Sequence, residues 1–315
     1  MSGPVQLQHT LTEQQPDGRY VHRLRQSWLN SVIGGCPEQA RMDARGQLER
    51  RETDATAVGT AVHAAIEAAI IAKQNGTPMS ADDIDDEFMA EWSAMQAELE
   101  IHWVKRQPDA ATAFGRACTT LFAEHIYGGL RPLATEVHFS ECLVHSDEHR
   151  DILLSGTIDY IDERYLGDWK TASRAYQPWE KDRWAIQPSA YWFAARNAMD
   201  LRDIVMQMDD DAVLDARWMY LVFPERATEP QLVPIQRQVE WDNWFIDQCL
   251  SLVPLLEADL DMWPKNDQSA LCSPIWATCW ESCKGSSVTS PSWVQRGTEV
   301  SINARPAPRQ LELAA

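Results

Sequence analysis

The chain has 315 residues and a formal net charge of −19, with 44% hydrophobic and 24% charged residues. This composition is that of a globular protein with a sizeable core, and the negative charge excludes a general coat protein for nucleic acid, which needs many basic phosphate contacts. No run reaches the roughly 18 apolar residues of a membrane helix, and the N-terminus lacks a secretory pattern. We therefore expect a cytoplasmic protein without a membrane partner. Its seven cysteines favour metal binding or thiols over disulfides there.

The first half of the chain is predicted to be mainly helical, after a loosely ordered segment over residues 1–25. Apolar residues recur at helical spacing, Ser80 is a candidate N-cap, and Asn75-Gly76 and Gly128-Gly129 are candidate helix ends. The expected helices cover 26–33, 55–73, 80–104 and 109–127.

The second half mixes strands with helices. The expected strands cover 133–143, 152–161, 165–171 and 216–223, and the expected helices cover 179–199 and 241–260. An irregular cysteine region follows over 264–284, and then a flexible tail. This order predicts an α/β fold in which a central mixed β-sheet is flanked by helices. Residues 55–129 form an N-terminal helical insertion in one domain over 26–284.

The clearest chemical signal is a predicted hairpin over residues 152–171. Side chains alternate along a strand, so Asp168 and Lys170 share one face and Trp169 points to the other. Asp159, late on the preceding strand, can lie beside Asp168. Two carboxylates suit Mg²⁺ or Mn²⁺, and a neighbouring lysine can orient water or stabilise negative charge. Alone, such a D-x-K tripeptide is more commonly a surface ion pair.

Further motifs lie outside the hairpin. His63 and Glu67 share a helix face, as do Gln187 and Tyr191, because each pair is four residues apart. Taken alone, each pair is more commonly structural. Four cysteines can provide four thiolates for an iron–sulfur cluster or zinc. These are Cys36, Cys272, Cys279 and Cys283. The other three, Cys118, Cys142 and Cys249, fit small buried side chains.

The order of these motifs resembles the RecB-like branch of the PD-(D/E)XK nucleases, which includes the CRISPR-associated RecB-like exonucleases and phage-encoded relatives. The resemblance covers residues 26–284 and implies a restriction-endonuclease-like core. It rests on an ordered set: Cys36-Pro37, G-T-x-x-H at 59–63, G-x-x-D at 156–159, D-x-K-T at 168–171, Q-x-x-x-Y at 187–191, and the late cysteines.

The resemblance also implies roles for individual residues. His63, Asp159, Asp168 and the Trp169 carbonyl match the ligands of Mg²⁺ or Mn²⁺, and Lys170 matches the catalytic lysine. Gln187 and Tyr191 match residues that organise the active site and contact DNA. Glu136 stands where relatives often carry an acid. The cysteine set Cys36, Cys272, Cys279 and Cys283 matches that of a structural 4Fe–4S cluster. Its x6 and x3 spacing differs from the usual one, so zinc or no metal remain alternatives.

The implied function is a DNA exonuclease of phage or bacterial origin that acts on single-stranded ends. The resemblance is compatible with a recombination, helicase or CRISPR-adaptation partner and with a ring-shaped homo-oligomer. Three alternatives remain open: a non-catalytic scaffold for such a partner, a structure-selective endonuclease, and a phosphodiesterase acting on RNA.

Overall fold

The computed structural model describes residues 5–6, 11–48, 52–258 and 260–266, together with Cys272, Cys279 and Cys283. The expected flexible tail from residue 285 lies outside the described residues.

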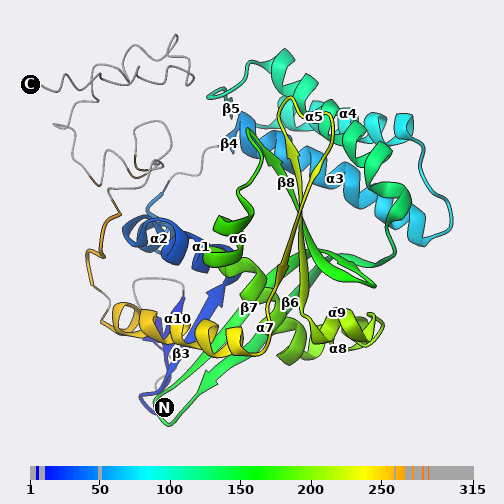
Figure 1. Cartoon of the computed structure of the whole chain (residues 1–315). Coiled ribbons are helices and arrows are strands. Elements are labelled where there is room, and N and C mark those ends of the chain that lie inside the picture. The colour runs from blue at the N-terminus through cyan, green and yellow to red at the C-terminus, as the bar shows by residue number, and fades with distance from the viewer. Residues whose placement is uncertain are drawn as a thin grey trace, which may run out of the picture.

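A mixed β-sheet forms the centre of the molecule (Figure 1). Its strand order is β1-β2-β3-β7-β8-β9-β10, and β6 pairs with β7 outside this path. The β3–β7 and β8–β9 pairs are parallel, and the others are antiparallel. The strands are β1 (Val5–Gln6), β2 (Thr12–Gln14), β3 (Tyr20–Arg25), β6 (Pro132–Ser146), β7 (Arg150–Asp162), β8 (Tyr165–Ala172), β9 (Arg217–Pro224) and β10 (Gln231–Gln236). A separate pair joins β4 (Glu52–Thr53) to β5 (Ile101–His102).

Helices cover both faces of the sheet and account for two cores. One core joins α1, α7 and α10 to side chains such as Trp218 and Tyr220 of β9. The other joins α3, α4 and α5 to Leu221 and Phe223 of the same strand. The alternation of side chains along β9 therefore links the two cores. The longer helices are α1 (Gln26–Gly34), α2 (Pro37–Ala44), α3 (Asp54–Gln74), α4 (Ala81–Glu98), α5 (Pro108–His125), α7 (Ile186–Asn197) and α10 (Glu240–Glu257). The shorter ones are α6 (Pro178–Trp184), α8 (Arg202–Val205), α9 (Asp210–Leu214) and the 3₁₀ turns Tyr127–Gly129 and Met199–Leu201.

The expected mixed sheet with flanking helices is confirmed, and α3, α4 and α5 form the expected helical insertion. The helix α3 is long and apolar enough to cross a membrane by length and composition alone. In the fold, however, one side of α3 packs against α4 and α5 through residues such as Val62, Ile66 and Ile70. This is the environment of a core helix.

Some local predictions were wrong. Residues 20–25 form β3 rather than a loosely ordered segment, because their partner is β7, more than 120 positions later. The helix expected over 179–199 is broken at Ala185. Pro188 gives the reason, since its ring would clash with the carbonyl of Trp184 in a continuous helix. Pro188 is tolerated in the first turn of α7, because the first N–H groups of a helix make no intrahelical hydrogen bond.

Candidate active site

The hairpin forms as predicted from β7 and β8. Asp162 pairs with Tyr165 across a tight turn, and Tyr160 pairs with Gly167. Trp169 packs into the core, with ring centroids 5.1 Å from Tyr160 and 5.5 Å from Phe122. Strand alternation therefore turns the neighbouring residues 168 and 170 toward the opposite face.

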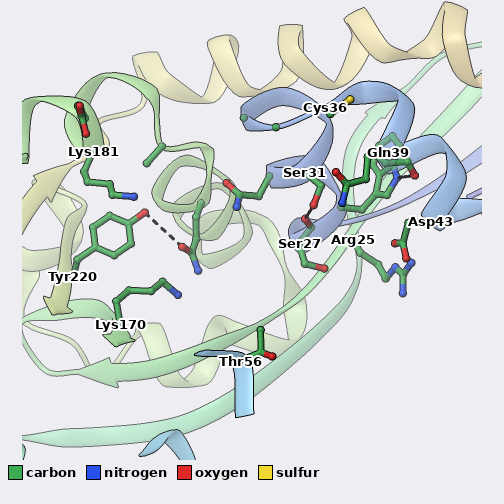
Figure 2. A pocket seen from close by; sticks show the side chains of 18 of the residues that line it. Arg25, Ser27, Ser31, Cys36, Gln39, Asp43, Thr56, Lys170, Lys181 and Tyr220 are labelled. Atoms are coloured by element: carbon green, nitrogen blue, oxygen red, sulfur yellow. Dashed lines mark hydrogen bonds between the residues drawn. The ribbon is translucent and has the colours of Figure 1, made fainter. Parts of the chain in front are cut away.

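Asp168 is fully buried and holds two side chains in place. Lys170 Nζ donates a 2.8 Å hydrogen bond to Asp168 Oδ1, and Gln187 Nε2 donates another of 2.6 Å to the same oxygen. Asp168 Oδ2 lies 2.6 Å from the Lys170 ammonium, but at an angle that makes no hydrogen bond. On the far side, Tyr220 donates a 3.5 Å hydrogen bond to Gln187 Oε1, the dashed contact of Figure 2.

Lys170 stays cationic in this arrangement. Burial disfavours its charged form, but the negative charges of Asp168 and Asp159 outweigh burial and raise the pKa of Lys170. The ammonium group is therefore a fixed positive charge beside the carboxylates.

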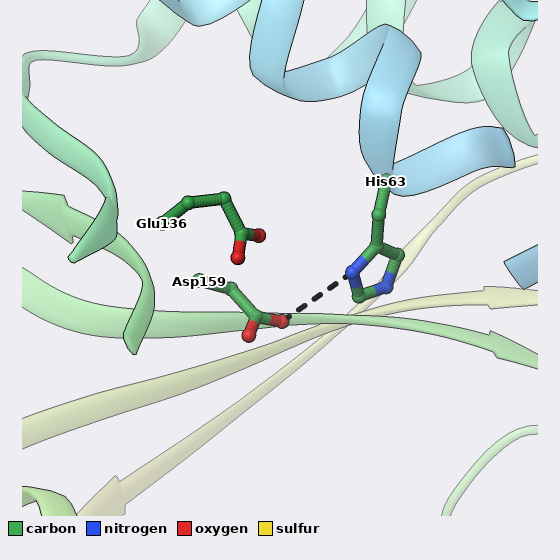
Figure 3. Close-up of side chains that lie close together, drawn as sticks. All are labelled: His63, Glu136 and Asp159. Atoms are coloured by element: carbon green, nitrogen blue, oxygen red, sulfur yellow. Dashed lines mark ion pairs between the residues drawn. The ribbon is translucent and has the colours of Figure 1, made fainter. Parts of the chain in front are cut away.

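Three side chains from different elements meet near Asp168 and Lys170. Figure 3 shows these three side chains. His63 comes from α3, Glu136 from β6 and Asp159 from β7, and one ligand atom of each lies within 4.8 Å of the others. Glu136 faces Asp159 because the flanking pairs are Thr135 with Tyr160 and Val137 with Ile158.

Glu136 has a left-handed backbone with a φ of 48°. Such a conformation costs a non-glycine residue about 1–3 kcal/mol and is found preferentially at functional sites. Partial burial and the charges of Glu67 and Asp168 raise the pKa of Glu136, and the charge of Lys170 offsets only part of this increase. Both features are consistent with a residue held in position for a ligand.

His63 is oriented to offer a lone pair to the same site. Its Nε2 lies 2.9 Å from the Trp169 carbonyl, to which it donates when the ring is neutral. That tautomer leaves the lone pair of Nδ1 toward Asp159, whose Oδ2 is 3.6 Å away. Burial and the charge of Lys170 lower the pKa of His63, so the neutral ring is favoured. Backbone carbonyls commonly orient metal-binding histidines in this way.

The set of donors fits a hard divalent cation. Burial, followed by the charge of Asp168, raises the pKa of Asp159 well above its ordinary value. Carboxylates crowded at a buried position are stabilised by a bound cation, and carboxylate oxygens with imidazole are suitable ligands for Mn²⁺ or Mg²⁺.

The Q-x-x-x-Y motif meets the G-x-x-D motif in the fold. A Cβ on Gly156 would lie 3.1 Å from the Tyr191 ring and 3.0 Å from that of Phe139, so only glycine lets both rings pack against β7 without displacement. Tyr191 donates a 3.2 Å hydrogen bond to Oε1 of the buried Gln26. Tyr191 therefore connects β7 to α1.

The cysteines singled out from the sequence gather away from this site. Burial and the charges of Cys283, Cys36 and Cys272 together raise the pKa of Cys279 to about 11. The segment 260–266 lies against the start of α2. Glu38 of α2 accepts a 2.7 Å hydrogen bond from the Trp263 backbone and a bidentate pair from Arg41. All four cysteines are free thiols, and a tetrathiolate metal site formed by them stays a prediction.

Three residues beside the site were not found from the sequence: Gln26, Tyr176 and Lys181. Gln26 contacts Tyr191 across 165 positions, for which no local pattern exists. Lys181 and Tyr176 line a cavity together with Lys170. Their positions on a loop and a short helix carry no periodic signal.

The mixed sheet with flanking helices is a restriction-endonuclease-like fold. The family model of the PD-(D/E)XK nuclease superfamily matches residues 31–284, and the chain belongs to this superfamily.

A solved crystal structure described as a "Putative exonuclease" from Eubacterium rectale is similar in fold, with a TM-score of 0.48 and 12% sequence identity. The match covers 88% of this chain and 94% of that chain. Among curated proteins, none matches this chain significantly.

Proposed function

We propose that the chain is a metal-dependent DNA exonuclease that hydrolyses phosphodiesters at single-stranded ends. The observation that supports this best is the convergence of His63, Glu136 and Asp159 beside the Asp168–Lys170 pair. Membership of the nuclease superfamily gives the reaction class.

In this proposal, Asp159, Glu136 and His63 hold Mg²⁺ or Mn²⁺, with Asp168 and the Trp169 carbonyl as further candidate ligands. The ion supplies Lewis-acid polarisation of the phosphodiester and a water of lowered pKa. Lys170 remains protonated and stabilises the negative charge that develops at phosphorus. Gln187 and Lys170 hold Asp168, so the charged groups need little reorganisation during the reaction.

The test is cleavage of end-labelled single-stranded DNA with Mg²⁺ or Mn²⁺. Asp168→Ala and Lys170→Ala should each lower the rate by at least about a hundredfold, the scale expected for a lost electrostatic contact to a transition state. Asp247→Asn, an exposed change on α10, is the control. Wild-type rates in both active-site variants would exclude this site.

Circular single strands and matched RNA separate the alternatives. An exonuclease leaves circles intact, whereas cleavage of circles indicates an endonuclease. Faster cleavage of RNA than of the matched DNA would identify RNA as the substrate. Complete inactivity of the wild type on all substrates would favour the scaffold, with a recombination, helicase or CRISPR-adaptation protein as partner.

We further propose that Cys36, Cys272, Cys279 and Cys283 bind a 4Fe–4S cluster that joins the two ends of the domain. Support comes from the charge effect of Cys36, Cys272 and Cys283 on the Cys279 thiol and from the resemblance to cluster-bearing nucleases. Protein purified without oxygen should be brown and contain iron and sulfide, and Cys279→Ser should lose both. Stoichiometric zinc would indicate the alternative metal, and wild-type protein without any metal would contradict the assignment.

A further inference from the structure

A cavity of about 990 Å³ extends from Lys170 to α1 and Cys36. Figure 2 shows Lys170, Lys181 and Tyr220 at one end, and Ser27, Ser31 and Arg25 across from them. This volume is at the upper end of the range of about 300–1,000 Å³ for small-molecule pockets. It suits a short stretch of a single strand better than a duplex.

The two walls of the cavity differ in chemistry. The α1 wall is polar and uncharged, because Ser27, Asn30, Ser31 and Gly34 repeat at helical spacing along the cavity side. Of the buried apolar residues of α1, Leu29 and Val32 pack in the core, whereas Trp28 also reaches the cavity lining. The opposite wall carries Lys170 and Lys181, and the lining also includes the carboxylates of Asp43, Glu52 and Glu180. Lys170 is paired with Asp168, so Lys181 is the ammonium on this wall that can attract an anionic occupant.

Lys181 differs from Lys170 in its partners. Lys170 is paired with Asp168, whereas no carboxylate in the described part of the chain forms an ion pair with Lys181. Its Nζ lies 4.0 Å from the ring centroid of Tyr176 and 5.7 Å from that of Tyr220. A ring face attracts the charge of the ammonium but does not use all of its N–H donors. Donors remain for an acceptor in the cavity.

The surroundings fix Lys181 in this place. The Tyr176 backbone is held at both of its polar groups by one side chain: its N–H donates to Gln231 Oε1 at 2.7 Å, and its carbonyl accepts from Gln231 Nε2 at 2.9 Å. Tyr176 in turn packs edge-on against Tyr220, with ring centroids 6.1 Å apart. Tyr220 is linked through Gln187 to Asp168. Lys181 is therefore positioned by the same hydrogen-bond and ring contacts that position Asp168 and Lys170.

We propose that Lys181 binds a phosphodiester of the DNA strand next to the one that is cleaved, and that the strand runs from Lys170 along the cavity past α1. This inference rests on the proposed nuclease function. The half-buried Lys181 ammonium has no carboxylate in ion-pair contact, which is unfavourable. A phosphate oxygen would supply both a negative charge and a hydrogen-bond acceptor for it. Burial and the charge of Lys170 already lower the pKa of Lys181, which a bound phosphate would reverse.

The experiment measures binding of a fluorescent single-stranded oligodeoxynucleotide by anisotropy, in EDTA so that no cleavage occurs. Lys181→Met keeps the alkyl stem against the rings and removes the charge. Its affinity should fall on the order of tenfold, the loss expected for one charged hydrogen bond. The slope of log affinity against log salt should shrink by about 0.7, the value for one phosphate contact on a single strand. Lys181→Arg should restore both.

The matched control is Arg183→Ala, which removes a positive charge from an exposed residue of the same helix, outside the cavity lining. Its binding should stay close to that of the wild type. An equal loss in Arg183→Ala, or an unchanged salt slope in Lys181→Met, would overturn the inference.

Cleavage distinguishes this failure from a failure of the proposed function. Lys181→Met should raise KM and keep most of kcat. A wild type that cuts DNA while Lys181→Met binds and cuts equally well contradicts only the role of Lys181. A wild type that neither binds nor cuts contradicts both. If duplex DNA or matched RNA binds more tightly than single-stranded DNA, single-stranded DNA is not the ligand of this cavity.

Discussion

Replacing Asp159 with asparagine is expected to stabilise the protein without metal while it abolishes cleavage. Ligand oxygens of Asp159 and Glu136 lie within 4.8 Å. Two unit charges at that distance repel by about 1 kcal/mol in water and by about 3.5 kcal/mol at an effective dielectric constant of about 20. Glu136 is exposed and Lys170 offsets part of the repulsion, so we expect a gain of about 1–2 kcal/mol. Asparagine can still accept the 3.3 Å hydrogen bond from the Trp169 N–H.

The gain should grow as the pH rises. Burial and the Asp168 charge raise the folded-state pKa of Asp159, so the folded protein binds this proton more tightly than the unfolded chain. The resulting stability is fully present below the unfolded pKa of about 3.9 and is lost as the pH rises through the folded pKa. Asparagine does not titrate, so the variant escapes this loss.

The assay is thermal unfolding in EDTA between about pH 5 and 8, the range in which this loss can be followed. For a chain of this length, 1–2 kcal/mol corresponds to a Tm increase of about 2–4 °C. Mn²⁺ at a hundred times its Kd should stabilise the wild type by about 2.7 kcal/mol and stabilise Asp159→Asn much less. A variant no more stable than the wild type in EDTA, or an equal effect of Mn²⁺ on both, would refute the reasoning. Asp247→Asn controls for the loss of one surface charge.

Three other changes test the structure. Glu38→Gln should destabilise the fold by about 3 kcal/mol in urea unfolding, because it removes the carboxylate charge that faces the buried Arg41 guanidinium. Gly115→Ala should cost about 1–3 kcal/mol, since its Cβ would meet the Phe88 ring at 2.1 Å, and an unchanged Tm would contradict this packing. Burial raises the pKa of Cys142 to about 12, so native protein should resist alkylation there at neutral pH in peptide mass mapping, whereas unfolded protein should react.

The hairpin and its chemistry follow from local sequence alone. Alternation along β8 is a local property of the strand, so the placement of Asp168 and Lys170 opposite Trp169 could be deduced without a fold. The turn between β7 and β8 is short, which made the approach of Asp159 to Asp168 predictable as well. The alternating pattern over 133–143 also located most of β6.

The tertiary structure decided which distant residues join that hairpin. Glu136 meets Asp159 through the register of β6 against β7, and His63 arrives on a helix packed across the sheet end. Lys181 gains its surroundings from Tyr176, Tyr220 and the Gln231 side chain of β10. These contacts depend on how separate elements pack, and the side chains involved show no periodicity that marks them in advance. Local sequence therefore indicated the reaction, whereas the packing of the sheet and helices positioned the groups around it.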